Sequence, residues 1–232
     1  MCGRFGLGID GQDLAELLQL DLSLDEGQTL EPRYNIAPSQ EAAVVRLDRA
    51  GRRKLHLIRW GLVPSWSRDR SIGAKLINAR SETAGDKPSF REALERRRCL
   101  VPTDGFYEWK SEEGGKQPYH IGRHDRGLLC FAGLWERWTD PQTARPLDTF
   151  TILTTTPNTL MGKLHHRMPV ILDPSTYDRW LDRRHDGRGV ADLLKPCAED
   201  LLAAWPVSNR VNRPANDDSA CRDRVDTSAF TQ

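Results

Sequence analysis

The sequence predicts a single α+β domain, built on a barrel-like, mostly antiparallel β-sheet with flanking helices. Many short apolar runs, rich in β-branched and aromatic residues, are separated by turn-forming residues, which is the pattern of a sheet. Only a few segments repeat apolar residues at helical spacing. No repeat, low-complexity tract or long linker divides the 232 residues, so we expect one core, with the domain at 1–222 and a tail at 223–232.

The first quarter of the chain is expected to hold one helix and one hairpin. Residues 12–20 place Leu at helical spacing and predict a short amphipathic helix, and the acidic stretch at 21–33 predicts a loop. Apolar runs at 42–47 and 55–60 predict two strands, which the turn-like residues 48–53 join into a hairpin.

The middle of the chain is expected to begin with a loop or a helix start at 77–83. A helix is predicted at 89–98, with Ser89 as its N-cap and Glu92 at the third helical position, which is a capping-box pattern. The basic run at 96–98 suits the helix dipole, and we expect it to be a solvated helix end. The remaining patterns predict strands at 105–109, 119–122, 128–135, 150–155 and 206–207, a loop entering a strand at 163–172, a helix at 175–181 and weaker helices at 190–194 and 199–204.

Composition excludes several classes of protein. Hydrophobic residues make up 38% of the chain and charged residues 29%, which is typical of a globular protein with a substantial core. No stretch approaches the roughly 18 apolar residues of a membrane span, and no basic segment leads into an apolar run as in a signal peptide. We therefore expect a cytoplasmic protein that has no membrane partner, and we also expect a monomer.

The cysteines point to a reducing compartment. There are five, an odd number, they are widely spaced, and no two form a Cys-x-x-Cys pair, which argues against a disulfide framework and against a zinc site. Cys99 and Cys130 lie in apolar runs and are expected to be buried thiols. We expect no metal and no cofactor.

The charge balance excludes a global basic field, because the formal net charge is only +1. The cations are mostly Arg, with seven Lys among 34 basic residues. Since Arg binds phosphate with two parallel hydrogen bonds and stacks on flat rings, a local anion-binding groove is compatible with this composition.

The start of the chain, Met1-Cys2-Gly3, offers unusual chemistry. Cells remove an initiator Met when the second residue is small, so we expect Cys2 to be the mature N-terminus. Its amine and thiol, with unperturbed pKa values of about 8 and about 8.5, would then sit on adjacent carbons. The amine can attack an aldehyde to form an imine, and the thiol can close on the imine carbon to form a five-membered thiazolidine.

Three further residues are candidates for proton transfer or positioning. Asn78 offers an amide that can hold an amine or a thiol, although an ordinary turn Asn is the alternative. Glu108 lies between Tyr107 and Trp109, where we expect burial to raise its pKa towards neutral; a surface Glu is the alternative. His165 can exchange a proton near pH 7.

Candidate DNA contacts come from cations and from one tryptophan. Arg4 and Arg80 could each grip a phosphate, with a structural ion pair as the alternative. Trp66 lies in a predicted loop and could stack on a base, although most of the seven Trp are expected in the core.

Together these pieces resemble a known family. The chain contains, in order, Met-Cys-Gly-Arg-Phe, Tyr-Asn-Ile-Ala-Pro, Trp-Gly-Leu-Val-Pro, Asn-Ala-Arg-Ser-Glu-Thr, Gly-Phe-Tyr-Glu-Trp and His-x-Arg-Met-Pro. This order resembles the SRAP family, the SOS-response-associated peptidase domain proteins that shield abasic sites in DNA damage. The resemblance extends from Cys2 to about Asp218.

The resemblance implies a barrel-like fold with a groove for single-stranded DNA, and a covalent crosslink between protein and abasic site. It implies that Cys2 is the nucleophile, that Asn78 positions it, and that Glu108 and His165 handle protons. It also implies DNA contacts by Arg4, Arg80 and Trp66. An associated lyase activity, removal of Met1 by the protein itself and a bacterial-type, nucleoid-associated location belong to the same expectation.

Two departures and two alternatives stand beside this resemblance. The family often has paired aromatics where this chain has Trp66-Ser67, so stacking would depend on Trp66 alone, and it often has an acidic residue at the place of His166. An N-terminal-Cys amidotransferase or hydrolase is one alternative function. A non-covalent module that binds single-stranded DNA is the other.

Overall fold

The structure is a computed structural model, which describes residues 2–20, 29–113 and 115–226. Residues 21–28 of the predicted acidic loop and residues 227–232 of the predicted tail lie outside this described part. The boundary at residue 222 stays a prediction. The backbone N–H of Val225 donates to the carbonyl of Pro206, so the described chain keeps contact with the domain beyond that boundary.

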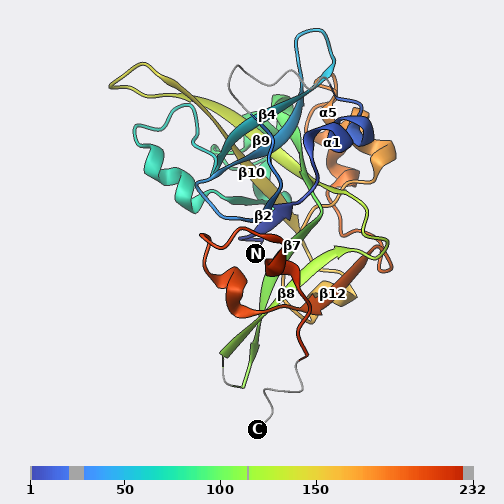
Figure 1. The fold of residues 1–232 in the computed structure, drawn as a ribbon. Helices are drawn as coiled ribbons and strands as arrows, with labels where there is room; N and C mark the ends of the chain where they lie inside the picture. The colour runs from blue at the N-terminus through green and yellow to red at the C-terminus, as the bar shows by residue number, and fades with distance from the viewer. Residues whose placement is uncertain (1, 21–28, 114, 227–232) are drawn as a thin grey trace.

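A closed five-stranded barrel forms the centre of the molecule (Figure 1). Its strands are β3 (Glu41–Leu47), β4 (Arg53–Trp60), β6 (Arg98–Thr103), β9 (Leu129–Thr139) and β10 (Pro146–Thr155). The order β10-β4-β3-β6-β9 closes on itself because β9 also pairs with β10. The β4–β10 pair is parallel, and the other four pairs are antiparallel.

A second, antiparallel sheet lies beside the barrel. Its order is β12-β8-β7-β1-β2, with β12 at Leu202–Pro206, β8 at Gly115–Arg123, β7 at Gly105–Glu112, β1 at Phe5–Leu7 and β2 at Arg33–Ile36. In Figure 1 the strands β7, β8 and β12 extend below the barrel strands β4, β9 and β10. The first strand of the chain is therefore an inner strand of this sheet, between β2 and β7.

Aromatic rings join the two sheets. Phe5 of β1 meets Trp60 of the barrel edge-on, with ring centres 5.0 Å apart, and Phe106 of β7 meets Phe131 in the same way at 5.6 Å. All four side chains are fully buried, in the same apolar cluster as Cys2. Edge-to-face pairs of this kind stabilise a core beyond the area that they bury. The packing therefore fixes the start of the chain against the barrel.

Helices cover the outside of the barrel. Alternate residues of a strand point to opposite faces: Ala42 and Val44 share the cluster of Cys2, whereas Ala43 and Val45 pack in a second cluster with helical side chains. The helices of that second cluster are α1 (Gly11–Leu18), α3 (Arg91–Arg96) and α5 (Tyr177–Leu181).

Short elements complete the fold. They are β5 (Asn78–Arg80), α2 (Ser81–Ala84), α4 (Thr159–Gly162), β11 (Met168–Pro169) and the 3-10 helices η1 (Arg70–Lys75), η2 (Pro174–Thr176), η3 (Arg188–Leu193), η4 (Asn209–Asn212) and η5 (Ser219–Arg222). None of the helices in the described ranges is long and apolar enough to cross a membrane.

The predicted α+β class and barrel-like sheet are confirmed, as are the helix near residues 12–20 and the hairpin at 42–60. Cys99 and Cys130 are buried thiols, as expected. Segment 77–83 differs from the prediction, because it begins with strand β5, which pairs in parallel with β10 before α2 starts.

The predicted helix at 89–98 was wrong at both ends. The helix starts at Arg91 with Phe90 as its N-cap, and no side chain caps it. Phe90 is 4% exposed, so its burial in the core outweighs the local capping pattern. Arg98 is not a solvated helix end: it begins β6, is buried, and donates to the carbonyls of Leu94, Glu95, Trp180, Asp182 and His185.

The weak helix predicted at 199–204 was also wrong. Residues 202–206 form strand β12, which pairs antiparallel with β8. Leu and Ala favour helices locally, but pairing with the open edge of β8 satisfies the backbone in an extended conformation instead.

Candidate functional site

The backbone of Cys2 is held by the side chain of Asn78. The Nδ2 amide of Asn78 donates to the Cys2 carbonyl at 2.8 Å. Asn78 begins β5, where it pairs in parallel with Ile152 of β10, so the barrel fixes its position. Among the described residues, the buried Oδ1 atom of Asn78 has no hydrogen-bond partner. That acceptor is therefore open to a donor that the described residues do not supply.

The Cys2 side chain lies in an apolar setting. It is fully buried, and its Sγ lies 3.9 Å from the carbonyl oxygen of Arg4. Burial raises the pKa of the Cys2 thiol well above its usual range, and the nearby charge of Glu108 raises it further. The thiol therefore carries its proton at neutral pH and needs a base before it can attack.

Glu108 supplies a carboxyl group next to Cys2. Strand β7 pairs with β1 so that Phe106 lies opposite Phe5, and the N–H of Tyr107 donates to the carbonyl of Arg4 at 2.9 Å. This register brings the following residue, Glu108, level with the start of the chain. Glu108 is 4% exposed. Burial raises the pKa of Glu108, and the positive charge of the amino terminus opposes that rise.

His165 follows α4 and is half-buried. Its ring stacks on that of His166, with centres 4.2 Å apart. Burial lowers the pKa of His165, and the amino-terminal charge and His166 lower it further. Glu108 and His165 both respond to the amino-terminal charge, so they lie in one electrostatic neighbourhood.

Arg4 is bound within the protein. Its Nη1 donates to Asn35 Oδ1 at 2.7 Å and to the carbonyl of Val211 at 2.6 Å, and its guanidinium lies 5.7 Å from the ring centre of Trp109. Burial lowers the pKa of Arg4. Arg4 thus links the start of the chain to the segment before its C-terminus.

Arg80 and Trp66 are both exposed. Arg80 ends β5, and because strand residues alternate, it lies on the same side of the strand as Asn78. Trp66 is 59% exposed and lies in the loop before η1. The indole N–H of Trp138 donates to the carbonyl of Ser67 at 2.7 Å and anchors that loop.

Three residues with long-range contacts near the site were missed by the sequence interpretation. Asn35 is fully buried and donates through Nδ2 to the carbonyls of Val211, Arg213 and Asn216. Arg167 and Glu82 form an ion pair with two hydrogen bonds. All three lie in the quoted motifs, which was the available signal, but their partners are too distant in sequence to be inferred from spacing.

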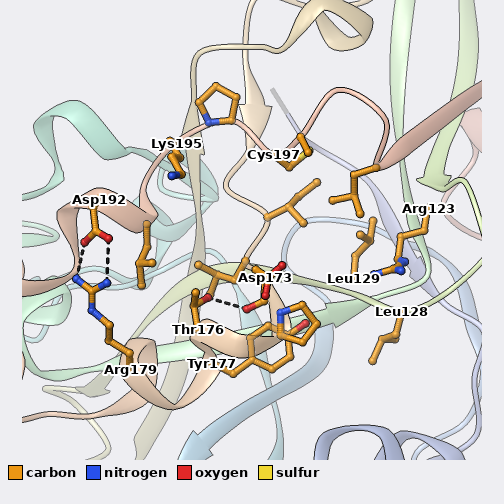
Figure 2. Close-up of a pocket in the computed structure, with 17 residues that line it drawn as sticks. Arg123, Leu128, Leu129, Asp173, Thr176, Tyr177, Arg179, Asp192, Lys195 and Cys197 are labelled. Atoms are coloured by element: carbon orange, nitrogen blue, oxygen red, sulfur yellow. Dashed lines mark hydrogen bonds and ion pairs between the residues drawn. The ribbon is translucent and has the colours of Figure 1, made fainter.

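A separate cavity is lined by other residues (Figure 2). It encloses about 390 Å³, and its lining includes Leu129, Tyr177 and Cys197. Figure 2 shows Arg179 and Asp192 paired on one side of it. Burial raises the pKa of the Cys197 thiol to about 12, so that thiol is a poor nucleophile at neutral pH. None of the predicted site residues lines this cavity.

No metal centre is formed by the described part of the chain, in which no three His, Cys, Asp or Glu side chains are grouped to hold an ion. The side chains around Cys2 carry an amide, a carboxyl and an imidazole group, which form hydrogen bonds and transfer protons. These groups can hold the backbone of a nucleophilic residue in place and supply that residue with an acid and a base.

Known proteins share this sequence over most of its length. Residues 1–214 match the SOS response associated peptidase (SRAP) family. The chain is 44% identical over 218 residues to the abasic site processing protein YoqW of Bacillus subtilis, covering 93% of this chain and 96% of that protein. It is 37% identical over 230 residues to the abasic site processing protein HMCES of Gallus gallus, covering 85% and 67%.

Solved structures share the fold. A crystal structure of a protein from Bacteroides thetaiotaomicron superposes with a TM-score of 0.89 at 28% identity, covering 97% of this chain and all of that one. A protein from Bordetella bronchiseptica superposes with a TM-score of 0.76 at 26% identity, covering 89% of this chain. The ordered motifs, the barrel and these relatives lead to one conclusion: the chain belongs to the SOS response associated peptidase (SRAP) family.

Proposed function

We propose that this protein processes abasic sites by binding single-stranded DNA and forming a thiazolidine crosslink through Cys2. The observation that carries the proposal is the convergence of Asn78 and Glu108 on Cys2, one through a hydrogen bond to its carbonyl and one through its charge. The relatives named as abasic site processing proteins support the substrate. DNA binding would also place the protein at the nucleoid.

The amine must first be freed. Removal of Met1 leaves the α-amine on Cys2, the residue whose carbonyl Asn78 holds. The open Oδ1 of Asn78 can then accept a hydrogen bond from that amine and direct its lone pair. Removal of Met1 by the protein itself is part of the proposal, with Glu108 and His165 as its candidate acid and base.

DNA binding precedes the chemistry. Arg80 is exposed next to Asn78 and can contact a phosphate, and the exposed Trp66 can stack beside the damaged position. Arg4 has Nη1 engaged by Asn35 and Val211, so we assign its phosphate contact to Nη2, for which the described residues show no hydrogen bond. The contacts on either side leave the aldehyde of the ring-opened sugar facing Cys2.

Imine formation uses a proton from the buried carboxyl. The neutral amine attacks C1′ of the aldehyde and gives a carbinolamine. Glu108, with His165 as the alternative acid, then protonates the hydroxyl, which leaves as water, and a protonated imine forms. Burial raises the pKa of Glu108, which keeps more of its protonated form available near neutral pH.

Ring closure returns the proton. Because burial raises the pKa of the Cys2 thiol, the thiol must give its proton to a base as sulfur attacks the imine carbon. The carboxylate that Glu108 became in the previous step is the base that we assign. The carbon–sulfur bond forms, the nitrogen keeps its hydrogen, and Glu108 is again protonated.

The thiol protects the DNA strand. An imine withdraws electrons and promotes β-elimination, which cleaves the strand, and ring closure removes the imine. Cys2→Ala keeps an amine but has no thiol, so we expect it to cleave abasic DNA as a lyase without forming a heat-stable crosslink. The crosslink should reverse through the same steps with the same acid and base, and we expect this reversal to depend on His165.

A denaturing gel tests the proposal. Wild-type protein incubated with single-stranded DNA carrying one abasic site is expected to give a heat-stable, slowly migrating band, and undamaged DNA is expected to give none. Glu108→Ala should slow formation of the band, and His165→Ala should slow its loss. Binding without a covalent band would favour a non-covalent DNA-binding module, and release of ammonia from glutamine would favour an amidotransferase.

A further inference from the structure

One short segment, residues 78–84, contacts both Cys2 and the side chain of Arg167. β5 and α2 run without a break from Asn78, which holds Cys2, to Ala84. Glu82 lies in this segment, and its Oε1 and Oε2 accept hydrogen bonds from Nη1 and Nη2 of Arg167 at 2.8 and 2.7 Å. A two-point contact of this kind fixes the orientation of the guanidinium as well as its distance.

Arg167 is enclosed on its other side by the barrel. It is 8% exposed, and its Nη2 also donates to the carbonyl of Thr154 at 2.6 Å. Thr154 of β10 is the residue that pairs with Arg80 of β5, so the guanidinium lies where these two strands meet α2. Two of its hydrogen bonds therefore attach the turn after α4 to the segment that holds Cys2, and the third attaches that turn to β10.

The backbone of Arg167 controls the ring of His165. Its N–H lies 3.0 Å from His165 Nδ1, and its carbonyl oxygen lies 3.3 Å from the same atom. The shorter contact, and the burial that lowers the pKa of His165, favour a ring whose Nδ1 accepts. A neutral ring that accepts at Nδ1 carries its proton on Nε2.

We propose that Glu82 is a positioning residue of this site, which holds His165 in one orientation and one tautomer through its ion pair with Arg167. The proposal rests on the proposed function for the step that it affects, which is the reversal of the crosslink. Without Glu82, a buried guanidinium loses its only carboxylate among the described residues and is drawn towards water. The turn that carries His165 would move with it.

Glu82 acts on His165 and not on Cys2. The hydrogen bond from Asn78 to Cys2 depends on β5, which is held by pairing with β10 and not by Glu82. Loss of Glu82 should therefore slow the step that uses His165 more than the step that uses Glu108. A role in stability alone would change both steps equally.

The test uses Glu82→Gln and a matched control, Glu92→Gln. Glu92 also lies in the first turn of a helix and also accepts from an arginine, Nη1 of Arg97 at 2.9 Å, but its helix α3 packs on β6 and β9. Crosslinks are formed first and their reversal is then followed after removal of free DNA, so the affinity for DNA does not enter the rate.

Glu82→Gln should slow reversal about tenfold, since a small misplacement of a reacting group costs up to about a hundredfold, while crosslink formation stays near the wild-type rate. Glu82→Asp, which keeps the charge, should recover part of the loss, and Glu92→Gln should match wild type. Equal slowing of both steps, or wild-type reversal in Glu82→Gln, would overturn the proposal.

Nitrogen NMR of labelled histidine gives a readout that needs no DNA. Wild type and Glu92→Gln should show His165 as one tautomer with the proton on Nε2, and Glu82→Gln should show averaging between both tautomers. If wild type formed no crosslink, the proposed function would fail and this spectrum alone would decide the role of Glu82. An unchanged His165 signal in Glu82→Gln would refute that role.

Discussion

Asn78 donates from Nδ2 to the backbone carbonyl of Cys2 at 2.8 Å, across 76 positions of sequence. The contact leaves Oδ1 buried without a partner among the described residues. One amide therefore holds the backbone of the proposed nucleophile and offers an acceptor beside it. A side chain that is charged, longer or shorter would not reproduce both contacts.

Asn78→Asp keeps the size of the side chain and removes the donor. A carboxylate oxygen facing the Cys2 carbonyl repels it, so we expect crosslinking to slow at least about tenfold, because positioning contributes strongly to such rates. Asn209→Asp, at an exposed position, is the matched control and should react as wild type. Rates are measured by denaturing gel, and a wild-type rate for Asn78→Asp would contradict the positioning role.

Glu108→Gln should alter stability in a pH-dependent way. Burial raises the pKa of Glu108 above its unfolded value of about 4.3, so the ionised form destabilises the native state, and the effect is absent below that unfolded pKa. Stability is lost as pH rises through the folded pKa. Gln cannot ionise, so the stability of the variant relative to wild type should rise between pH 4 and pH 8.

Urea unfolding of wild type and Glu108→Gln at both pH values measures this difference. The comparison cancels the titration of all other groups that the two proteins share. A difference in unfolding free energy that is the same at pH 4 and pH 8, or that falls with pH, would show that the folded pKa of Glu108 is not raised.

Trp66→Ala should weaken binding of single-stranded DNA. Stacking on one base contributes about 1–3 kcal/mol, which corresponds to roughly 5- to 150-fold in affinity. Leu17→Ala is the matched control, because Leu17 is equally exposed, at 60% against 59% for Trp66, but lies on α1. Fluorescence anisotropy with undamaged DNA measures the affinity of both variants. Equal affinity would show that Trp66 does not contact the DNA.

Arg98→Met should destabilise the fold. The guanidinium donates to five carbonyls, and each buried acceptor left unpaired costs about 1–3 kcal/mol, so we expect a loss of about 3 kcal/mol or more. Arg96→Met, at an exposed position at the end of α3, should lose less than about 0.5 kcal/mol. Urea unfolding compares them, and similar losses would contradict the account of Arg98.

The sequence predicted those parts of the fold that depend on local pattern. The hairpin at 42–60 follows from two apolar runs and one turn, and the helix at 11–18 follows from the spacing of its Leu residues. The start of α3 was missed because a capping box is local, whereas Phe90 is placed by the core. Strand β12 was missed because its Leu and Ala favour helices until β8 offers an edge.

The candidate site could be named from the sequence but not assembled from it. Cys2 and His165 have chemistry that a sequence reveals, and the ordered motifs gave Asn78 and Glu108. Their distances depend on the pairing of β5 with β10 and of β1 with β7, which no local pattern encodes. Glu82 and Arg167 are 85 positions apart, so their ion pair required the structure.

The central claim is that the amine and the thiol of one residue, Cys2, both bond to the same carbon of an abasic site. Intact mass spectrometry of the crosslink, with and without borohydride, tests it most directly. We predict the mass of the protein without Met1 plus the DNA minus one water, unchanged by borohydride, because a thiazolidine has no imine to reduce. An adduct that retains Met1, or one that persists only after reduction, would contradict the claim.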